Sequence, residues 1–266
     1  MKILYIGDVM GEAGIETVEK VLPKILEEHS SSVVIAQAEN VTEGKGLSVA
    51  DYERLKRAGV HAFTSGNHTM RRDETTALLE DEGIAVTRPA NYPEGTAGKQ
   101  YKILQTEQGS ILLVSLLGSI VGKDSEKPMD NPLACVDSIL NTLSNQEFMA
   151  IIVNFHGDFS SEKVVIGHYL DGRVTAVIGD HWHTPTADAR VLKGGTAHIT
   201  DVGMVGSLDS SLGVKYDSII TRWRDGIPTR NELETSGAMQ FNAVLIEVNS
   251  ETNRAKTITQ IRKILN

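Results

Sequence analysis

Short polar segments follow apolar runs at several places in this chain, and their side chains are of the kinds that bind metal ions. Carboxylates, amides and imidazoles make up the set, and it contains no thiolate. The segments are Gly7-Asp8, Glu39-Asn40, Gly66-Asn67-His68, His156 and Gly179-Asp180-His181-Trp182-His183. Taken singly, each has an ordinary explanation: Asp8 could cap a helix, and Asn67 could form a turn. Their shared position, directly after predicted strands, favours a metal site.

The donor set predicts the class of metal and of reaction. Carboxylates and imidazoles without thiolates suit manganese, iron or zinc in a catalytic centre better than a structural zinc site. There are enough ligands for two ions that share a carboxylate, and paired ions clamp the attacking and leaving oxygens of a displacement at phosphorus. A water between the ions would become hydroxide near neutral pH. His68, beside Asn67, could protonate the leaving alkoxide.

The first third of the chain predicts the elements that bring these segments together. Apolar runs rich in β-forming residues predict strands at residues 3–6, 33–36 and 61–64. Helical spacing predicts helices at 15–28, 48–58 and 73–82, the second with Ser48 as its N-cap. Strand, polar loop and helix alternate, which favours parallel strands with crossover helices. Function gathers at the carboxyl edge of such sheets, so the polar segments should meet there.

The second half predicts a second sheet. Residues 101–106 and 111–115 read as a hairpin, and residues 133–143 as a helix. Further strands are expected at 151–155, 174–178 and 197–200, and an antiparallel pair at 243–248 and 256–261. Residues 118–132 carry Gly, Pro and charge without a clear period, and we interpret them as a long loop over the site that shapes substrate choice. We therefore expect residues 1–266 to form a single domain with two packed sheets.

Composition and charge narrow the class of protein. The 266 residues are 40% hydrophobic and 23% charged, as in ordinary globular proteins. The net charge of −9 argues against non-specific nucleic-acid binding, but it permits a small phosphorylated substrate because bound cations invert the local field. The single cysteine, Cys135, excludes an internal disulfide and, with no signal peptide, predicts a cytoplasmic location. No segment approaches the length of a membrane span.

Together the motifs resemble the calcineurin-like metallophosphoesterase pattern, and most closely its YmdB-type branch. The shared blocks are the polar segments above, joined by Gly44-Lys45-Gly46, Arg88-Pro89-Ala90-Asn91-Tyr92-Pro93, Ser161-Glu162-Lys163, Asp171-Gly172-Arg173, Thr186-Ala187-Asp188 and Thr200-Asp201-Val202-Gly203-Met204. The resemblance runs over nearly the whole chain. It implies an α/β fold, a four-layer α/β/β/α sandwich of two mixed β-sheets flanked by helices.

The resemblance also implies a role for each site residue. One ion would be held by Asp8, Glu39, Asn40 and His183, and the other by Glu39, Asn67, His156 and His181. Glu39 would bridge the ions, and His68 would be the proton donor. The implied activity is hydrolysis of 2′,3′- or 3′,5′-cyclic nucleotides by a hydroxide that bridges two metal ions, with iron or manganese expected and zinc allowed. We also expect a homo-oligomer.

This chain departs from the family pattern at a few positions next to the site. Met10 stands where many members have His, and Asn40 would replace that missing ligand. Asp158 stands where the branch commonly has Glu, and Asp180 where it commonly has Thr. An added carboxylate at Asp180 could raise metal affinity or disfavour an anionic substrate. These changes leave every ligand position intact and leave substrate preference open. Two other functions also stay open: a phosphomonoesterase, and a regulatory or scaffold protein that binds metal with little turnover.

Overall fold

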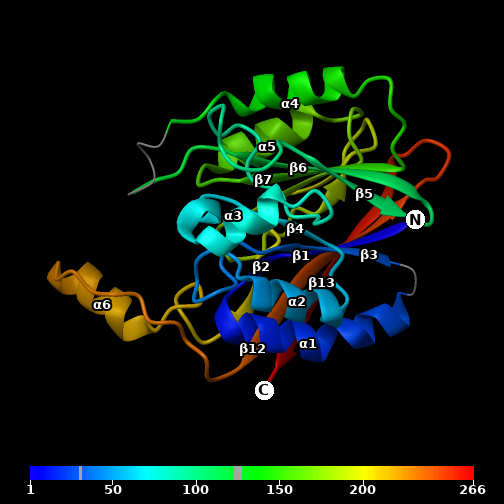
Figure 1. The fold of residues 1–266 in the computed structure, drawn as a ribbon. Helices are drawn as coiled ribbons and strands as arrows, with labels where there is room; N and C mark the ends of the chain where they lie inside the picture. The colour runs from blue at the N-terminus through cyan, green and yellow to red at the C-terminus, as the bar shows by residue number, and fades with distance from the viewer. Residues whose placement is uncertain (30–31, 123–127) are drawn as a thin grey trace.

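Two mixed β-sheets pack face to face between two layers of helices (Figure 1). The computed structural model describes residues 1–29, 32–122 and 128–266. The expected four-layer α/β/β/α sandwich is confirmed. Within the described residues, no helix has both the length and the apolar character needed to cross a membrane.

The first sheet has seven strands in the order β2-β11-β12-β1-β3-β4, with β13 paired to β12. Their bounds are β1 Lys2–Ile6, β2 Asp8–Val9, β3 Ser32–Gln37, β4 Ala62–Thr64, β11 Met204–Ser207, β12 Met239–Val248 and β13 Ala255–Leu265. The predicted parallel arrangement is confirmed, because β1 pairs in parallel with β3, and β3 with β4. The predicted antiparallel pair is also present as β12 and β13.

The second sheet has six strands in the order β5-β6-β7-β8-β10-β9. Their bounds are β5 Lys102–Thr106, β6 Gly109–Leu117, β7 Ala150–His156, β8 Ala176–Asp180, β9 Arg190–Val191 and β10 Ala197–Ile199. The four inner strands are parallel, and the hairpin of β5 and β6 forms one antiparallel edge. The second sheet thus places the ends of β7 and β8 side by side.

Helices cover the outer face of each sheet (Figure 1). The helices α1 Gly11–Glu28, α2 Val49–Ala58 and α3 Asp73–Glu80 pack on the first sheet, and α4 Pro132–Thr142 and α5 Ser160–Tyr169 pack on the second. Ser48 caps α2 as predicted, since its side chain accepts a hydrogen bond from the Asp51 amide. The helix α6 Tyr216–Asp225 projects from the body and buries none of its residues.

The strand β1 shows why its sequence is continuously apolar. Leu4 and Ile6 join the core under the helices, whereas Ile3 and Tyr5 join the core between the two sheets. Both faces of the strand are therefore buried, which removes the polar alternation of a half-exposed strand.

Two helices were missed by the sequence analysis, for a physical reason. In α5 the buried position 163 is a lysine, while Val164 and Val165 are exposed. In α6 no residue is buried, so the spacing of its apolar residues does not mark a face that packs on a core. The expected loop at 118–132 connects β6 to α4 and ends at Asn131, which caps that helix. Its residues 123–127 lie outside the described residues, so its position over the site stays a prediction.

Candidate metal centre

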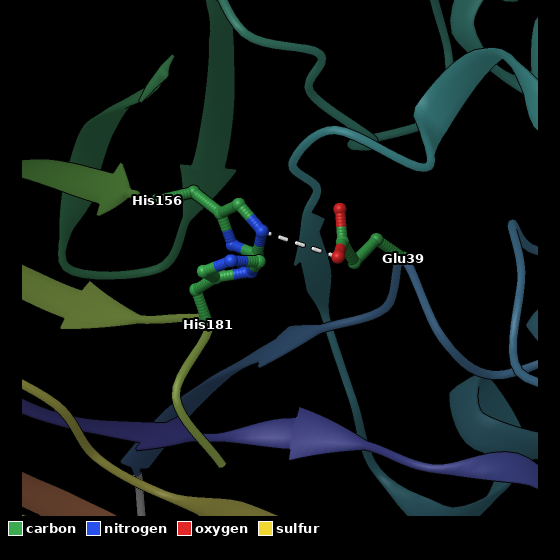
Figure 2. A group of neighbouring side chains, drawn as sticks. All are labelled: Glu39, His156 and His181. Carbon is green, nitrogen blue, oxygen red and sulfur yellow. Dashed lines mark ion pairs between the residues drawn. The ribbon is translucent and has the colours of Figure 1, made fainter. Parts of the chain in front are cut away.

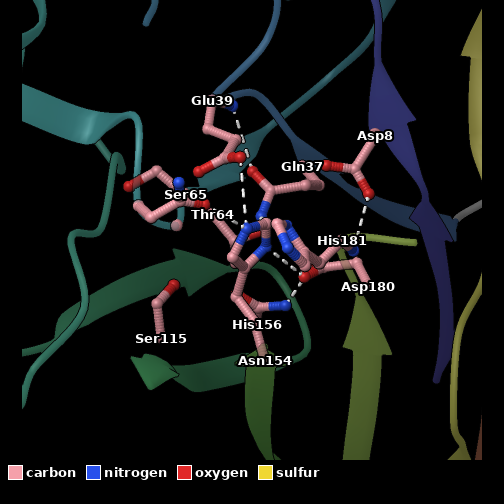
Figure 3. A network of polar contacts seen from close by, with 12 residues as sticks. Asp8, Gln37, Glu39, Thr64, Ser65, Ser115, Asn154, His156, Asp180 and His181 are labelled. Atoms are coloured by element: carbon pink, nitrogen blue, oxygen red, sulfur yellow. Dashed lines mark hydrogen bonds and ion pairs between the residues drawn. The ribbon is translucent and has the colours of Figure 1, made fainter. Parts of the chain in front are cut away.

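The polar segments meet at the carboxyl ends of strands from both sheets (Figure 3). In the first sheet, Asp8 begins the short strand β2 directly after β1, and Glu39 follows β3. In the second sheet, His156 ends β7 and His181 follows β8. The sandwich therefore brings side chains from the two halves of the chain into one place.

Glu39, His156 and His181 form a group of potential metal ligands among the described residues (Figure 2). One ligand atom from each residue lies within 4.8 Å of the others. Glu39 Oε1 is 3.1 Å from His156 Nε2, and both side chains are almost fully buried. Asn67 Oδ1 lies 2.9 Å from the same nitrogen. The residues that the resemblance assigns to one ion are thus adjacent, and their oxygen and nitrogen donors suit manganese, iron or zinc.

Asp8, Asn40 and His183 form a second group beside the first. His183 Nε2 is 3.7 Å from Asp8 Oδ1 and 3.2 Å from Asn40 Nδ2. Asn40 Nδ2 also lies 3.4 Å from Glu39 Oε1, which joins the two groups. Because an amide binds a cation through its oxygen, an ion here would require the Asn40 amide to be turned over.

His68 lies at the border of the second group. Its Nδ1 is 2.8 Å from Asn40 Oδ1 and 3.6 Å from Glu39 Oε1, and its backbone amide donates to Glu39 Oε2 at 3.0 Å. The side chain is 27% exposed, whereas Glu39 is only 1% exposed. His68 therefore combines contact with the predicted ligands and access to solvent.

Gly66 allows the loop after β4 to approach the other ligands closely. A Cβ at this position would overlap the ring of His156 and lie 2.5 Å from Glu39 Oε2. The glycine therefore supplies space rather than an unusual backbone angle, and any larger residue would displace a predicted ligand.

Asp180 makes contacts behind His156 that the sequence did not indicate. Its Oδ1 lies 2.7 Å from His156 Nδ1, and its Oδ2 accepts a hydrogen bond of 3.1 Å from Gln37 Nε2 (Figure 3). The Tyr5 hydroxyl donates a further hydrogen bond of 3.1 Å to Oδ2. The contact with His156 Nδ1 turns the other ring nitrogen, Nε2, toward Glu39 and Asn67. A carboxylate behind a ligating histidine fixes its ring and raises its basicity. The signals in the sequence were the position of Asp180 after an apolar run and its departure from the Thr that is common in the family.

The electrostatics of the centre follow from burial and from opposite charges held close together. Burial alone lowers the pKa of His156, but the carboxylates of Glu39 and Asp180 outweigh it and raise that pKa well above its usual range. Burial would raise the pKa of Glu39, but His156 holds it well below its usual range. Burial and the Asp180 charge raise the pKa of Asp8. Burial and the charge of His156 lower the pKa of His181 to about 4, so its imidazole is neutral at pH 7.

Comparison with known proteins places the chain in a family. Residues 4–261 match the family described as YmdB-like protein. The chain belongs to the YmdB-like family. This YmdB-like protein is 36% identical to a 2′,3′-cyclic-nucleotide 2′-phosphodiesterase of Bacillus subtilis strain 168. The match covers 98% of this chain and 96% of the relative.

Solved structures show the same fold as this YmdB-like protein. The crystal structure of a novel phosphatase from Mycoplasma pneumoniae superposes with a TM-score of 0.91 at 30% identity, covering 99% of this chain and 93% of the other. The calcineurin-like phosphoesterase YfkN from Bacillus subtilis gives a TM-score of 0.56 at 11% identity, with 99% and 90% covered. The second similarity concerns the fold alone, and it agrees with the expected metallophosphoesterase sandwich.

Proposed function

We propose that this YmdB-like protein is a phosphodiesterase that uses two metal ions to hydrolyse 2′,3′- or 3′,5′-cyclic nucleotides. Membership of the family, together with the similarity to a phosphodiesterase over nearly the whole chain, makes it a hydrolase acting on phosphoester bonds. The observation that carries the proposal is the buried group of Glu39, His156 and His181 at the ends of strands from both sheets. The substrate class is supported by the 36% identity to the Bacillus subtilis enzyme.

In this proposal, two sets of ligands share Glu39. Asp8, Glu39, Asn40 and His183 would hold one ion, and Glu39, Asn67, His156 and His181 would hold the other. Iron or manganese is expected, and zinc is compatible with the same donors. When bound, the ions would supply positive charge that activates water and offsets the charge developing at phosphorus.

The protein's own side chains supply the remaining chemistry. His68 holds the proton that the leaving oxygen takes, and its Nδ1 lies 3.6 Å from Glu39 Oε1, beside the predicted ligands. Asp180 keeps the His156 ring in place. The side chain of Glu39 contacts both groups of ligands, so its loss should affect the whole site.

The variant Glu39→Gln tests the ligand set. We expect it to lose most of its bound metal and to lower kcat/KM for 2′,3′-cyclic AMP more than 100-fold, because loss of an outer-shell partner alone costs about 10–100-fold. Glu82→Gln, the same change at an exposed position, is the matched control and should leave both quantities unchanged. Metal content from elemental analysis and initial rates measure the effect. Near-wild-type values for Glu39→Gln would refute the site.

The variant His68→Gln separates proton donation from metal binding. We expect it to keep its metal while kcat falls about 10²–10⁴-fold, the usual contribution of a general acid. Equal loss of metal in His68→Gln and Glu39→Gln would instead make His68 a ligand.

A phosphomonoesterase is the second candidate, and the similarity to the Mycoplasma pneumoniae protein, described as a novel phosphatase, favours it. Rates on bis-p-nitrophenyl phosphate and on p-nitrophenyl phosphate distinguish the two enzymes. Protein that binds metal and hydrolyses neither ester would instead fit a regulatory or scaffold role. The cytoplasmic location and the homo-oligomer stay proposals, which cell fractionation and sedimentation equilibrium test.

A further inference from the structure

Lys163 is a fully buried lysine behind the His181-Trp182-His183 segment. It lies on α5, and its ammonium group donates hydrogen bonds to the backbone oxygen of Asp180 and to Asp201 Oδ2, the latter at 2.8 Å. The ammonium nitrogen also lies 4.3 Å from the centre of the Trp182 ring, within the range of a cation–π contact. Of these partners, Trp182 lies within the segment, Asp180 directly precedes it, and Asp201 lies farther along the chain.

Asp201 is equally buried and contacts the same segment. Its Oδ2 accepts a hydrogen bond of 2.9 Å from the Trp182 amide, and its Oδ1 accepts one of 2.9 Å from the Gly203 amide. Lys163 and Asp201 therefore contact backbone groups on both sides of His181, the carbonyl of residue 180 and the amide of residue 182.

The segment held in this way has an unfavourable backbone conformation. His181 has a φ of +101° and His183 a φ of +61°, values that residues other than glycine rarely adopt. Such conformations are energetically unfavourable and persist only where the surroundings enforce them. Further contacts act on the same residues, because Asp8 Oδ2 accepts from the His181 amide at 3.2 Å and His183 Nδ1 lies 3.0 Å from Leu212 O.

We propose that Lys163 and Asp201 are positioning residues that hold His181 and His183 in the backbone conformation required for metal binding. The inference rests on the proposed metal centre, to which it adds residues that touch neither ion nor substrate. Packing alone does not explain the pair, because a buried ion pair carries a large desolvation penalty and apolar residues of similar volume are often as stabilising. An ammonium and a carboxylate can instead bind two backbone groups of opposite polarity, the carbonyl before His181 and the amide after it.

Trp182 provides a reporter for the test. The chain has two tryptophans, and Trp223 is 90% exposed on α6, so Trp223→Phe leaves Trp182 as the only indole. In that background, Lys163→Met removes the charge and hydrogen bonds but keeps a long side chain. We expect a shifted Trp182 emission and an affinity for Mn²⁺ about 10–100-fold lower by calorimetry, the usual effect of losing an outer-shell partner.

Lys102→Met is the matched control. Lys102 is also buried, and its ammonium group donates to the backbone oxygen of Asp81 at 2.7 Å, but it lies on β5 at the edge of the second sheet. We expect Lys102→Met to lower thermal stability and to leave Mn²⁺ affinity and Trp182 emission unchanged. Lys163→Arg, which retains the charge, should recover part of the affinity lost in Lys163→Met.

Turnover gives an independent readout. Because the predicted defect is in metal affinity, raising the Mn²⁺ concentration should restore most of the kcat of Lys163→Met on bis-p-nitrophenyl phosphate. A kcat that stays low at saturating Mn²⁺ would overturn the positioning role.

The remaining outcomes separate the two proposals. Wild-type protein that binds no Mn²⁺ would overturn the metal centre itself. Folded Lys163→Met with wild-type Mn²⁺ affinity would overturn only the positioning role. If Lys163→Met does not fold, the double variant Lys163→Met with Asp201→Asn, which leaves no unpaired buried charge, is measured in its place. Failure of that variant to fold would make the pair structural and would also overturn the inference.

Discussion

At the scale of single residues, Gly66 is a position where an added Cβ would overlap two of the predicted ligands. We expect Gly66→Ala to lower Mn²⁺ affinity at least 10-fold, because the new methyl group would displace Glu39 or the ring of His156. Gly83→Ala is the control: its Cβ would meet only Asp81 Oδ1, at 3.3 Å, on a side chain that can move. Titration calorimetry with Mn²⁺ compares the two. Unchanged affinity in Gly66→Ala would contradict the close packing of these ligands.

The sequence indicated which residues gather at the candidate centre better than it indicated the contacts that support them. Asp8, Glu39 and His156 could be named because each follows or ends an apolar run, a signal that is local in the chain. The partners of Asp180 and Lys163 are separated from them in sequence. They come into contact only because β7, β8 and α5 pack together. Gln37, for example, reaches Asp180 from the other sheet, and no local pattern predicts that contact.

At the scale of elements, Asp188 connects the loop after His181-Trp182-His183 to the end of β10 through hydrogen bonds. Its Oδ1 accepts a hydrogen bond of 2.6 Å from Thr186 Oγ1, and its carboxylate also accepts from the amide and hydroxyl of Thr200. Burial alone would raise the pKa of Asp188, but these hydrogen bonds outweigh it and lower the pKa below its usual value.

The lowered pKa of Asp188 predicts a pH-dependent contribution to stability. Because the folded protein holds the ionised form more strongly, the contribution is complete above the unfolded pKa of about 4 and is lost as pH falls through the folded pKa. We therefore expect Asp188→Asn to lower the free energy of unfolding at pH 7, with the difference from wild type shrinking below pH 4. Urea titrations across pH 2–7 measure it. Thr200→Val, which removes one donor, should weaken the same pH dependence; a difference that grows toward low pH would contradict the assignment.

The elements themselves were predictable where both faces of a strand are buried. The strands β1, β3 and β7 have continuous apolar runs because helices cover one face and the opposite sheet covers the other. The spacing of apolar residues did not predict the helices α5 and α6, because in them the buried residues and the apolar residues do not coincide. The short strand β11 was also missed, since it is brief and begins directly after a polar loop.

At the scale of the whole molecule, the predicted ligands come from both sheets, so we expect metal binding to stabilise the entire fold. We expect a single cooperative unfolding transition, coincident by near- and far-ultraviolet circular dichroism, which would agree with one domain over residues 1–266. Mn²⁺ at 100 times its Kd should add about 2.7 kcal/mol to the free energy of unfolding. Glu39→Gln should show the same transition without the Mn²⁺ effect. Two separate transitions would contradict the single domain.

The neighbours of β1 have a consequence for how the protein is made. This first strand lies between β3 and β12, and β12 is one of the last strands in the chain. While the polypeptide leaves the ribosome, one edge of β1 therefore has no partner until nearly all of the chain has been synthesised. An unpaired edge can recruit a strand from another chain, so translation is the period in which this protein is most exposed to misassembly. Asp8, the first predicted ligand to be synthesised, would be among the last to reach its final place.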